Sequence, residues 1–304
     1  MLFQKRRRQI VLMVFRDRVL SLEIGGTPRE IDISAFGESA PQAPIVEDGR
    51  VNHKALKEAV NASLSSLRSK ASTADIALGN DLVFAETLPI DDTLSHQALK
   101  AHLDWELNHY VDRPENHIVN TAILRRSADG EQKTMLVVAI PKSWIEALRD
   151  VLHGLHLSLD AVDTDHFGAE YFFRAAVSVP LHRPVIALAG VGSSRIDFSL
   201  LRNGRTETYS RRAIRDGASS HDIASDINAM VSALGEDVPS LVLHGEGTTP
   251  ELLEALRAGW GGSAQALDPL RYITAPGHVA HLIQGHPATT GGIGLGLRSL
   301  DSRR

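Results

Sequence analysis

The sequence lacks cysteine, any long apolar run and an excess of basic residues. With no cysteine among its 304 residues, the chain has no disulfide, thiolate metal site or cysteine nucleophile. No stretch reaches the eighteen or so apolar residues that a membrane-spanning helix needs, and the start has no signal-peptide pattern. The net charge of −5 argues against a nucleic-acid partner. We therefore expect a protein that stays on the cytoplasmic side and has no nucleic-acid partner.

What is present is the composition of an ordinary folded protein. Hydrophobic residues make up 43% and charged residues 23%, which is enough for two modest lobes. One local exception is the basic start MLFQKRRRQ, residues 1–9, with Lys5, Arg6, Arg7 and Arg8. Each basic residue near an anionic leaflet contributes roughly 1 kcal/mol, so this tail predicts weak attachment to a membrane surface; a solvated tail is the alternative. The fourteen histidines lack ligand spacing, so we expect no metal site.

Apolar periodicity predicts a repeated order of elements. Residues 10–36 alternate as three strands joined by tight turns, residues 52–70 have helical spacing, and two strands follow up to residue 90. A helix, a hairpin, a second helix and a strand at LDAVDTD then make up an insertion, placed at residues 91–160. From residue 161, a helix leads into another three-strand meander, a helix near 221–234, a strand and a helix near 251–260.

This repetition predicts an α/β fold of the duplicated, ribonuclease-H-like kind, with two lobes and a small inserted α+β subdomain. The expected divisions are a tail at 1–9, a first lobe at 10–90, an insertion at 91–160 and a second lobe at 161–304. Only about twenty-five residues separate Gly217 from the strand at Leu241, so one helix fits there. The second lobe is therefore expected to have a truncated subdomain.

Residues 185–204, VIALAGVGSSRIDFSLLRNG, form the most informative motif. A strand, a glycine-serine turn and an alternating strand resemble the phosphate-binding hairpin of actin-like ATPases, in which an Asp works through a metal ion. Gly190 stands at the position of that Asp. The candidate nucleotide-binding residues are Gly190, Gly192, Ser193 and Ser194, with Gly245 and Gly247 in a second loop. The alternative is that these residues only form a hairpin turn and a strand-to-helix turn.

Several collinear strings resemble the PilM-type actin-like proteins of type IV pilus assembly over almost the whole chain. They are MLFQKRRRQIVLMVF, ALKAHLDWELNHYVDRPENHIVN, the core MLVVAIPKSWIEALRDVLHGLHLSLDAVDTDHFGAEYFF, PSLVLHGEGTTPELLEAL and TTGGIGLGLRSL. Proteins of type II secretion systems share parts of this pattern, and the insertion resembles that of the division protein FtsA. The resemblance implies an actin-like fold of two lobes.

The departures from that family's active members concern the nucleotide site. An active member turns at Asp-x-Gly after its first strand, and the collinear residues here are Met13 and Phe15. The Asp of the second loop is replaced by Gly190, and Glu246 lies in the loop that would face adenosine. We therefore predict a degenerate member that lacks the ATPase acids, with no catalytic residue, metal ligand or cofactor. An ATPase or small-molecule kinase that binds ATP with Mg²⁺ is the alternative.

The resemblance also implies a task. A PilM-type protein is a cytoplasmic component, peripheral at the inner membrane, that binds the N-terminal cytoplasmic peptide of a membrane-spanning pilus or secretion protein and contacts other assembly components. A homo-oligomer is compatible with this task. Family resemblance implies a groove between the insertion and the first lobe, for which Trp105 and Tyr110 are the candidate peptide-binding residues. Most of the chain's aromatic residues are expected in the core by their spacing.

Overall fold

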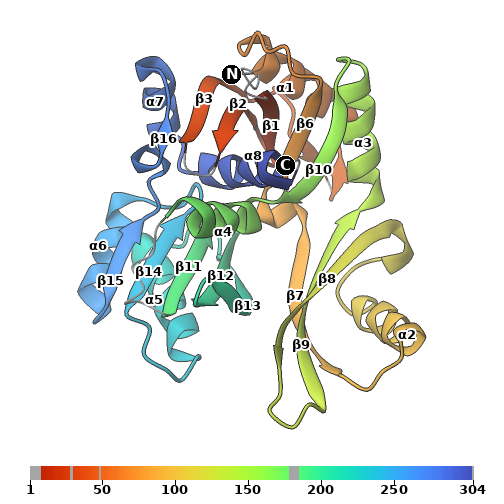
Figure 1. The fold of residues 1–304 in the computed structure, drawn as a ribbon, viewed down its shortest axis with the longest axis vertical. Coiled ribbons are helices and arrows are strands. Elements are labelled where there is room, and N and C mark those ends of the chain that lie inside the picture. The colour runs from red at the N-terminus through yellow and green to blue at the C-terminus, as the bar shows by residue number, and fades with distance from the viewer. Residues whose placement is uncertain (1–7, 28–29, 48, 178–184, 303–304) are drawn as a thin grey trace, which may run out of the picture.

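The computed structural model describes residues 8–27, 30–47, 49–177 and 185–302. Two sheets form an upper and a lower lobe, and a third, three-stranded sheet projects beside the lower lobe (Figure 1). The duplicated α/β architecture predicted from the element order is confirmed.

The first lobe contains a six-stranded sheet. Its strands, in spatial order, are β10 (Ser158–Thr164), β6 (Thr73–Leu78), β1 (Arg8–Val14), β2 (Val19–Thr27), β3 (Glu30–Ser39) and β16 (Ile273–Thr274). Strands β1, β2 and β3 form the antiparallel meander, whereas β6 runs parallel to both β1 and β10. The continuous apolar run of residues 10–14 is buried on both faces, as expected for a central strand.

Helices cover both faces of this sheet. Helices α1 (His53–Ser65) and α3 (Lys142–His153) share an apolar cluster with Ile10, Leu12 and Val14. The intervening residues Val11 and Met13 point to the other face, where they pack with α8 (Thr289–Ser302). Because successive strand residues face opposite ways, one apolar strand connects the two halves of the core.

The second lobe repeats the meander. Its strands, in spatial order, are β13 (Arg205–Ala213), β12 (Arg195–Arg202), β11 (Val185–Val191), β14 (Ser240–His244) and β15 (Ser263–Ala266). Helices α5 (Ser220–Ser232) and α6 (Pro250–Gly259) pack on one face of this sheet. In the described part of the chain, α5 is the one helix between β13 and β14, which confirms the truncated second-lobe subdomain.

The insertion is built around a sheet in the order β7 (Phe84–Asp91), β9 (Gln132–Pro141) and β8 (His117–Arg126). Helix α2 (His96–Leu107) contributes Leu103 and Leu107 to its core. The remaining elements are the hairpin of β4 (Val46–Glu47) and β5 (Arg50–Val51), α7 (Gly277–Gln284), and the short helices η1 (Asn80–Leu82), η2 (Pro114–Asn116) and η3 (Pro269–Arg271).

The pairing of strands differs from the expected divisions of the chain. Strand β7, expected in the first lobe, pairs with β9 of the insertion. Helix α3 and β10, expected in the insertion, belong to the first lobe, because α3 packs with α1 and β10 pairs with β6. The end of the chain returns to the first lobe through β16 and α8 rather than completing the second lobe. Pairing between distant segments decides these boundaries.

The start of the chain also differs in part from the prediction. Arg8, expected in the basic tail, belongs to β1, and its guanidinium pairs with Glu23 and Asp32. Residues 1–7 of the predicted tail lie outside the described residues. Among the described residues, no helix is both long and apolar enough to cross a membrane.

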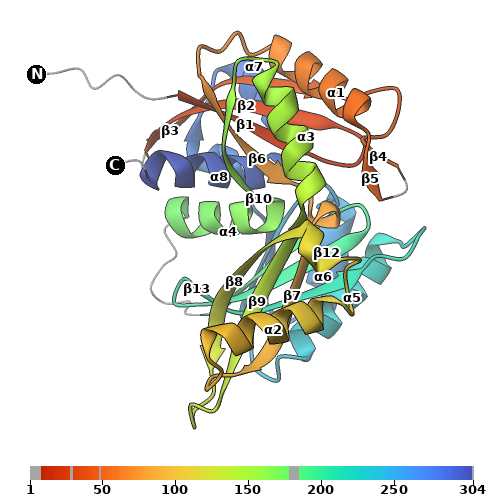
Figure 2. The same ribbon diagram turned by 90° about the vertical axis from the view of Figure 1, so that its right-hand side faces the viewer.

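Two helices lie side by side between the lobes, α4 (Asp165–Ala176) and α8 (Figure 2). Their backbones meet at glycines, since a Cβ atom on Gly294 would lie 1.8 Å from the carbonyl oxygen of Gly168. A side chain at this position would force the helices apart. Apolar residues of both sheets pack around this helix pair, so the two lobes share one core.

Candidate functional site

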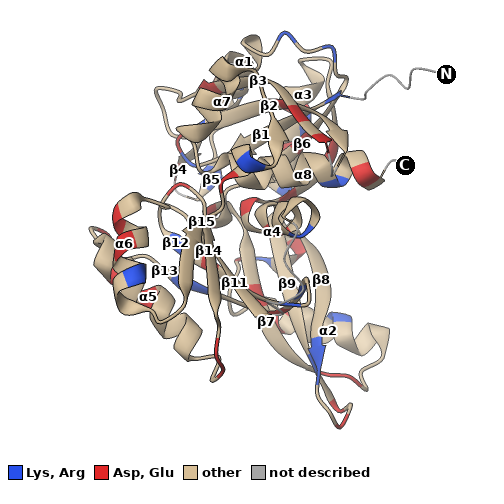
Figure 3. Ribbon diagram, turned by 60° about the vertical axis from the view of Figure 1, so that its left-hand side comes forward, with Lys and Arg blue, Asp and Glu red and all other residues tan. Residues whose placement is uncertain are grey.

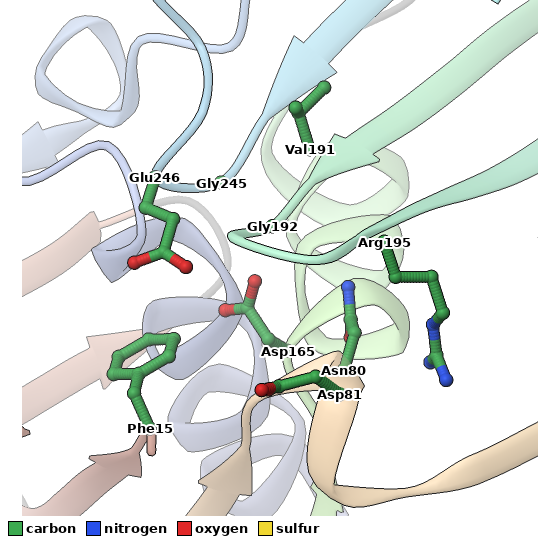
Figure 4. Close-up of a pocket in the computed structure, with 9 residues that line it drawn as sticks. All are labelled: Phe15, Asn80, Asp81, Asp165, Val191, Gly192, Arg195, Gly245 and Glu246. Carbon is green, nitrogen blue, oxygen red and sulfur yellow. The ribbon is translucent and has the colours of Figure 1, made fainter. Parts of the chain in front are cut away.

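A small cavity lies between the lobes, where an actin-like fold would hold a nucleotide. The first lobe, the β10–α4 junction and two turns of the second lobe line it, with Phe15, Asn80, Asp81, Asp165, Val191, Gly192, Arg195, Gly245 and Glu246 (Figure 4). Its volume of about 10 Å³ is near the minimum for a single water molecule. The described residues around this cavity therefore leave little space between them.

The first-strand turn contributes apolar groups to this cleft. Met13 is buried against α8, where a Cβ atom on Gly292 would lie 2.4 Å from its sulfur. Phe15 places its ring in the cavity lining, and the guanidinium of Arg18 lies 5.1 Å from the ring centroid. The neighbouring Asp17 is exposed and pairs with Arg18 at 3.3 Å, in a hairpin turn as predicted. This turn therefore presents the Phe15 ring and the Arg18 guanidinium, while Met13 points into the core.

Gly190 lies inside β11, directly against two histidine rings. A Cβ atom at this position would lie 2.7 Å from the His244 ring and 2.8 Å from Nδ1 of His166. These rings occupy the space that the side chain of an Asp would need, which gives a physical reason for the glycine. By contrast, Gly192 forms the hairpin with Ser193 and Ser194, which are both exposed.

The two histidines belong to a buried polar chain. Nδ1 of His166, in α4, lies 3.0 Å from Nε2 of His244, in β14, and Nε2 of His166 lies 2.8 Å from the hydroxyl of Ser199. All three residues are at most 1% exposed. Burial lowers the pKa of His166 to about 3 and also lowers that of His244, so both rings are neutral at pH 7. This pair was not predicted from the sequence, because its members are 78 residues apart.

Two further carboxyl groups that sequence analysis missed reach the cleft. Asp81 follows β6 and Asp165 follows β10, and these parallel neighbours end at the same edge of the sheet. Burial raises the pKa of Asp165 to about 8, helped by the charges of Glu246 and Asp197. Burial also raises the pKa of Asp81. The Arg16 guanidinium, whose Nε atom lies 2.6 Å from Oδ2 of Asp81, lowers this pKa but does not offset the effect of burial. The position of both residues just after parallel strands was the signal that could have found them.

The carboxyl group of Asp165 points into the cavity (Figure 4). It is 4% exposed, and its Oδ1 atom has no hydrogen-bond partner. Its Oδ2 atom lies 3.8 Å from Nδ1 of His244, which is too far for a direct hydrogen bond. At pH 7 this group is mostly protonated. Among the described residues, no three His, Asp or Glu side chains are placed to hold a metal ion.

The predicted adenosine loop packs tightly on the end of β11. The N–H of Gly247 donates to the carbonyl of Val191 at 2.9 Å, and Gly245 has a φ of +91°. A Cβ atom on either glycine would lie 2.5–2.6 Å from an atom of Val191. These glycines allow a close approach of two backbones. Between them, Glu246 forms an ion pair with Arg18 of the first lobe.

A second ion pair supports the cleft from inside the second lobe. Arg195 forms two hydrogen bonds of 2.9 Å with Asp197, and Tyr209 donates to the same carboxylate. The Arg195 guanidinium also donates to the carbonyl of Val83 at 2.9 Å, which joins the second lobe to the start of the insertion. It points away from the cavity in Figure 4. We therefore assign Arg195 a structural role in holding the insertion against the second lobe.

The candidate peptide-binding residues lie on the insertion, away from the cleft. Trp105, in α2, is 58% exposed and contacts the rings of His102 and His109. Tyr110, just after α2, is 49% exposed, and its ring lies 5.3 Å from that of Phe84. Figure 3 shows α2 at the end of the insertion opposite the first lobe, with acidic and basic segments interspersed in that view. The structure thus presents both aromatic residues on the surface without bringing them against the first lobe.

Known proteins support the fold assignment. Similar solved structures include a PilM–PilN type IV pilus biogenesis complex, with 17% identity, 97% of this chain and 99% of that chain covered, and a TM-score of 0.73. A Bacteroides thetaiotaomicron protein with an actin-like ATPase fold and unknown function has 15% identity and a TM-score of 0.57. The match covers 88% of this chain and 94% of that chain. An inorganic polyphosphate/ATP-glucomannokinase from Arthrobacter sp. strain KM has 10% identity and a TM-score of 0.50. The match covers 98% of this chain and 99% of that chain. At these identities the likeness establishes the fold alone.

The family of the chain follows from a match of its sequence to a family model. No curated protein has a significant match to the chain. The model of the family described as type IV pilus assembly protein PilM matches residues 19–229, which is more than half of the chain. The match spans β2 and β3 of the first meander, the insertion, the β10–α4 junction, the second meander and part of α5. The chain therefore belongs to the family of type IV pilus assembly protein PilM.

Proposed function

We propose that this protein is a non-catalytic actin-like scaffold of a type IV pilus or related secretion machine. Its task would be to bind the cytoplasmic N-terminal tail of an inner-membrane protein and to join it to other cytoplasmic assembly components. Membership of the PilM family supports this task, as does the likeness to a structure described as a PilM–PilN complex. On this proposal the protein is cytoplasmic and works at the inner membrane.

The loss of catalysis rests on the groups that occupy the cleft. The ring of Phe15 lies where an active member needs a glycine beside phosphate, and two histidine rings fill the space next to Gly190. The observation that carries the proposal is the pair of histidine rings 2.7–2.8 Å from a Cβ atom at Gly190, which leaves no space there for an Asp side chain. Opening this cleft for ATP would separate buried, mutually packed groups without providing a metal carboxylate in either phosphate turn.

One observation favours the alternative of an ATP-dependent enzyme. The carboxyl groups of Asp81 and Asp165 do reach the cleft from the ends of β6 and β10. Burial keeps Asp165 mostly protonated at pH 7, so it would need to lose its proton before it could act on Mg²⁺ or water. An enzyme would also need Gly192, Ser193, Ser194, Gly245 and Gly247 to contact phosphates after the lobes separate.

Nucleotide binding separates these two functions. A ligand present at a hundredfold its Kd stabilises a folded protein by about 2.7 kcal/mol. We expect no change in the thermal midpoint with Mg²⁺-ATP and no phosphate release above that of the buffer. A rise in the midpoint together with turnover that Asp165→Asn abolishes would instead establish the enzyme.

Peptide binding tests the scaffold directly. The probe is a synthetic copy of the cytoplasmic N-terminal tail of the membrane protein encoded beside this gene. We propose Trp105 and Tyr110 as contacts because large exposed aromatic residues commonly anchor peptides. Trp105→Ala and Tyr110→Ala should each weaken binding at least tenfold in calorimetry. Leu282→Ala, which trims an exposed apolar residue of α7, is the matched control. Undiminished binding by both aromatic variants would exclude this surface.

A further inference from the structure

The two lobes are joined across the mouth of their cleft by an ion pair between residues 228 positions apart in the chain. The Arg18 guanidinium comes from the turn between β1 and β2, and the Glu246 carboxylate comes from the turn between β14 and α6. Both side chains are mostly buried, with exposed fractions of 23% and 21%. Glu246 and Phe15, whose ring lies under the Arg18 guanidinium, both line the cavity between the lobes.

Both ends of this contact are held in place by their own lobes. On the first-lobe side, the N–H of Phe15 donates to the carbonyl of Arg18 at 2.9 Å, and the Phe15 ring lies under the guanidinium. On the second-lobe side, Gly247 bonds to Val191, and Gly245 permits the close approach of the two backbones. Because the turns are rigid, little side-chain freedom remains to be lost when the pair forms.

Two further acidic side chains lie near this pair. Asp17 lies 3.3 Å from Arg18 on the exposed side, and the Asp165 carboxyl lies deeper in the same cavity as Glu246. Arg18 is the cation that Glu246 contacts, so replacing Arg18 would leave the partly buried Glu246 carboxylate without this partner.

We propose that the contact between Arg18 and Glu246 is an interlobe latch that holds the cleft closed in place of a nucleotide. In this chain, lobe closure is intramolecular and does not depend on Mg²⁺-ATP. Breaking the ion pair, by charge reversal or by competition from salt, opens the cleft at its mouth. This device does not depend on which pilus component the protein binds, so its test is separate from the peptide experiment.

The absence of cysteine makes the latch directly measurable. Glu58→Cys in α1 and Glu254→Cys in α6 place one spin label on an exposed helix of each lobe. In electron–electron distance measurements, Arg18→Glu and Glu246→Arg should each lengthen and broaden the distance distribution. The double reversal Arg18→Glu/Glu246→Arg should restore the wild-type distribution. The near-isosteric Glu246→Gln provides a milder opening if a reversed charge prevents folding.

Two controls define what would overturn the latch. Arg212→Glu breaks an ion pair of 2.9 Å with Asp226 inside the second lobe, and it should leave the interlobe distance unchanged. Adding Mg²⁺-ATP to the wild type should also change nothing. A distance that stays the same in Arg18→Glu, Glu246→Arg and Glu246→Gln would refute the proposal. A double reversal that remains as open as the single variants would refute it as well.

Discussion

Nδ1 of His166 lies 3.0 Å from Nε2 of His244, and both rings are fully enclosed between α4 and the second-lobe sheet. Only one of these two nitrogens can carry the proton of the shared hydrogen bond, so the pair is compatible with neutral rings. A proton added to either ring would place an uncompensated charge in a buried site. The pair therefore fills the space next to Gly190 and requires both rings to stay neutral.

Because both histidine rings must stay neutral, the folded protein should lose stability in mild acid. The pKa of His166 is about 3 in the folded chain and 6.5 in the unfolded chain. A lowered folded-state pKa contributes stability above pH 6.5, and this contribution is lost as the pH falls toward 3. By pH 5 the loss should be about 2 kcal/mol for His166 alone. Urea unfolding at pH 7 and pH 5 measures it.

A matched pair of variants identifies the source of that acid sensitivity. His166→Gln should flatten the dependence of unfolding free energy on pH between 7 and 5, whatever its effect on stability at pH 7. His153→Gln removes an exposed histidine at the end of α3 and should keep the wild-type slope. Equal slopes in all three proteins would contradict the assignment.

Asp165 should have the opposite dependence on pH. Its pKa is about 8 in the folded chain and 3.8 in the unfolded chain, so the folded state holds a proton that the unfolded state releases. Stability from this group is complete below pH 3.8 and is lost as the pH rises through 8. Asp165→Asn should raise the unfolding free energy at pH 7 by up to about 4 kcal/mol. In urea titrations, the gain in unfolding free energy of Asp165→Asn over wild type should be greater at pH 8 than at pH 5. An Asp165→Asn protein less stable than wild type at pH 8 would exclude this explanation.

The order of strands and helices was accessible from sequence because each element carries its own apolar period. Residues 10–14 are apolar throughout and form a central strand, and Leu56 and Val60 recur at helical spacing on the buried face of α1. The partners of these elements were not accessible. Strand β10 and helix α8 join the first lobe through pairing and packing with segments far away in the chain.

The same limit applied to the candidate site. Gly190 was recognised by its place in a local motif, since the turn after β11 is contiguous in sequence. The histidines that explain this glycine come from α4 and β14 and meet only in the folded protein. Asp165 was visible in the string DAVDTDHF, but its direction toward the cleft depends on the parallel pairing of β10 with β6.

Restoring the lost acid should damage the fold rather than rebuild an ATPase. Gly190→Asp would place a Cβ atom 2.7 Å from the His244 ring and a carboxylate in a fully buried strand. Overpacking and burial of a charge together should destabilise the protein by at least about 3 kcal/mol. Thermal unfolding measures the change. Gly277→Ala is the control, because no atom lies within 4 Å of the added Cβ. A Gly190→Asp protein of wild-type stability that binds Mg²⁺-ATP would contradict this prediction.

The contact between α4 and α8 predicts a reversal of the usual effect of alanine in a helix. At an open helical position, Gly→Ala stabilises by roughly 0.5–1 kcal/mol, because alanine loses less backbone entropy on folding. At Gly294 the new Cβ would lie 1.8 Å from the carbonyl oxygen of Gly168 and 2.9 Å from Cβ of Phe172. Backbone cannot move aside as the end of a flexible side chain can.

Gly294→Ala should therefore destabilise the protein by about 1–3 kcal/mol, which is the usual cost of overpacking a core. Gly296→Ala, two residues further along α8, is an informative comparison because its Cβ would meet methyl groups of Val11 and Ile24 rather than backbone. Side chains can yield by changing rotamer, so this variant should lose less stability than Gly294→Ala. Urea unfolding midpoints of both variants measure these two losses of stability. If Gly294→Ala were as stable as wild type, α4 and α8 would not be in backbone contact, and the core shared by the two lobes would have to be packed differently.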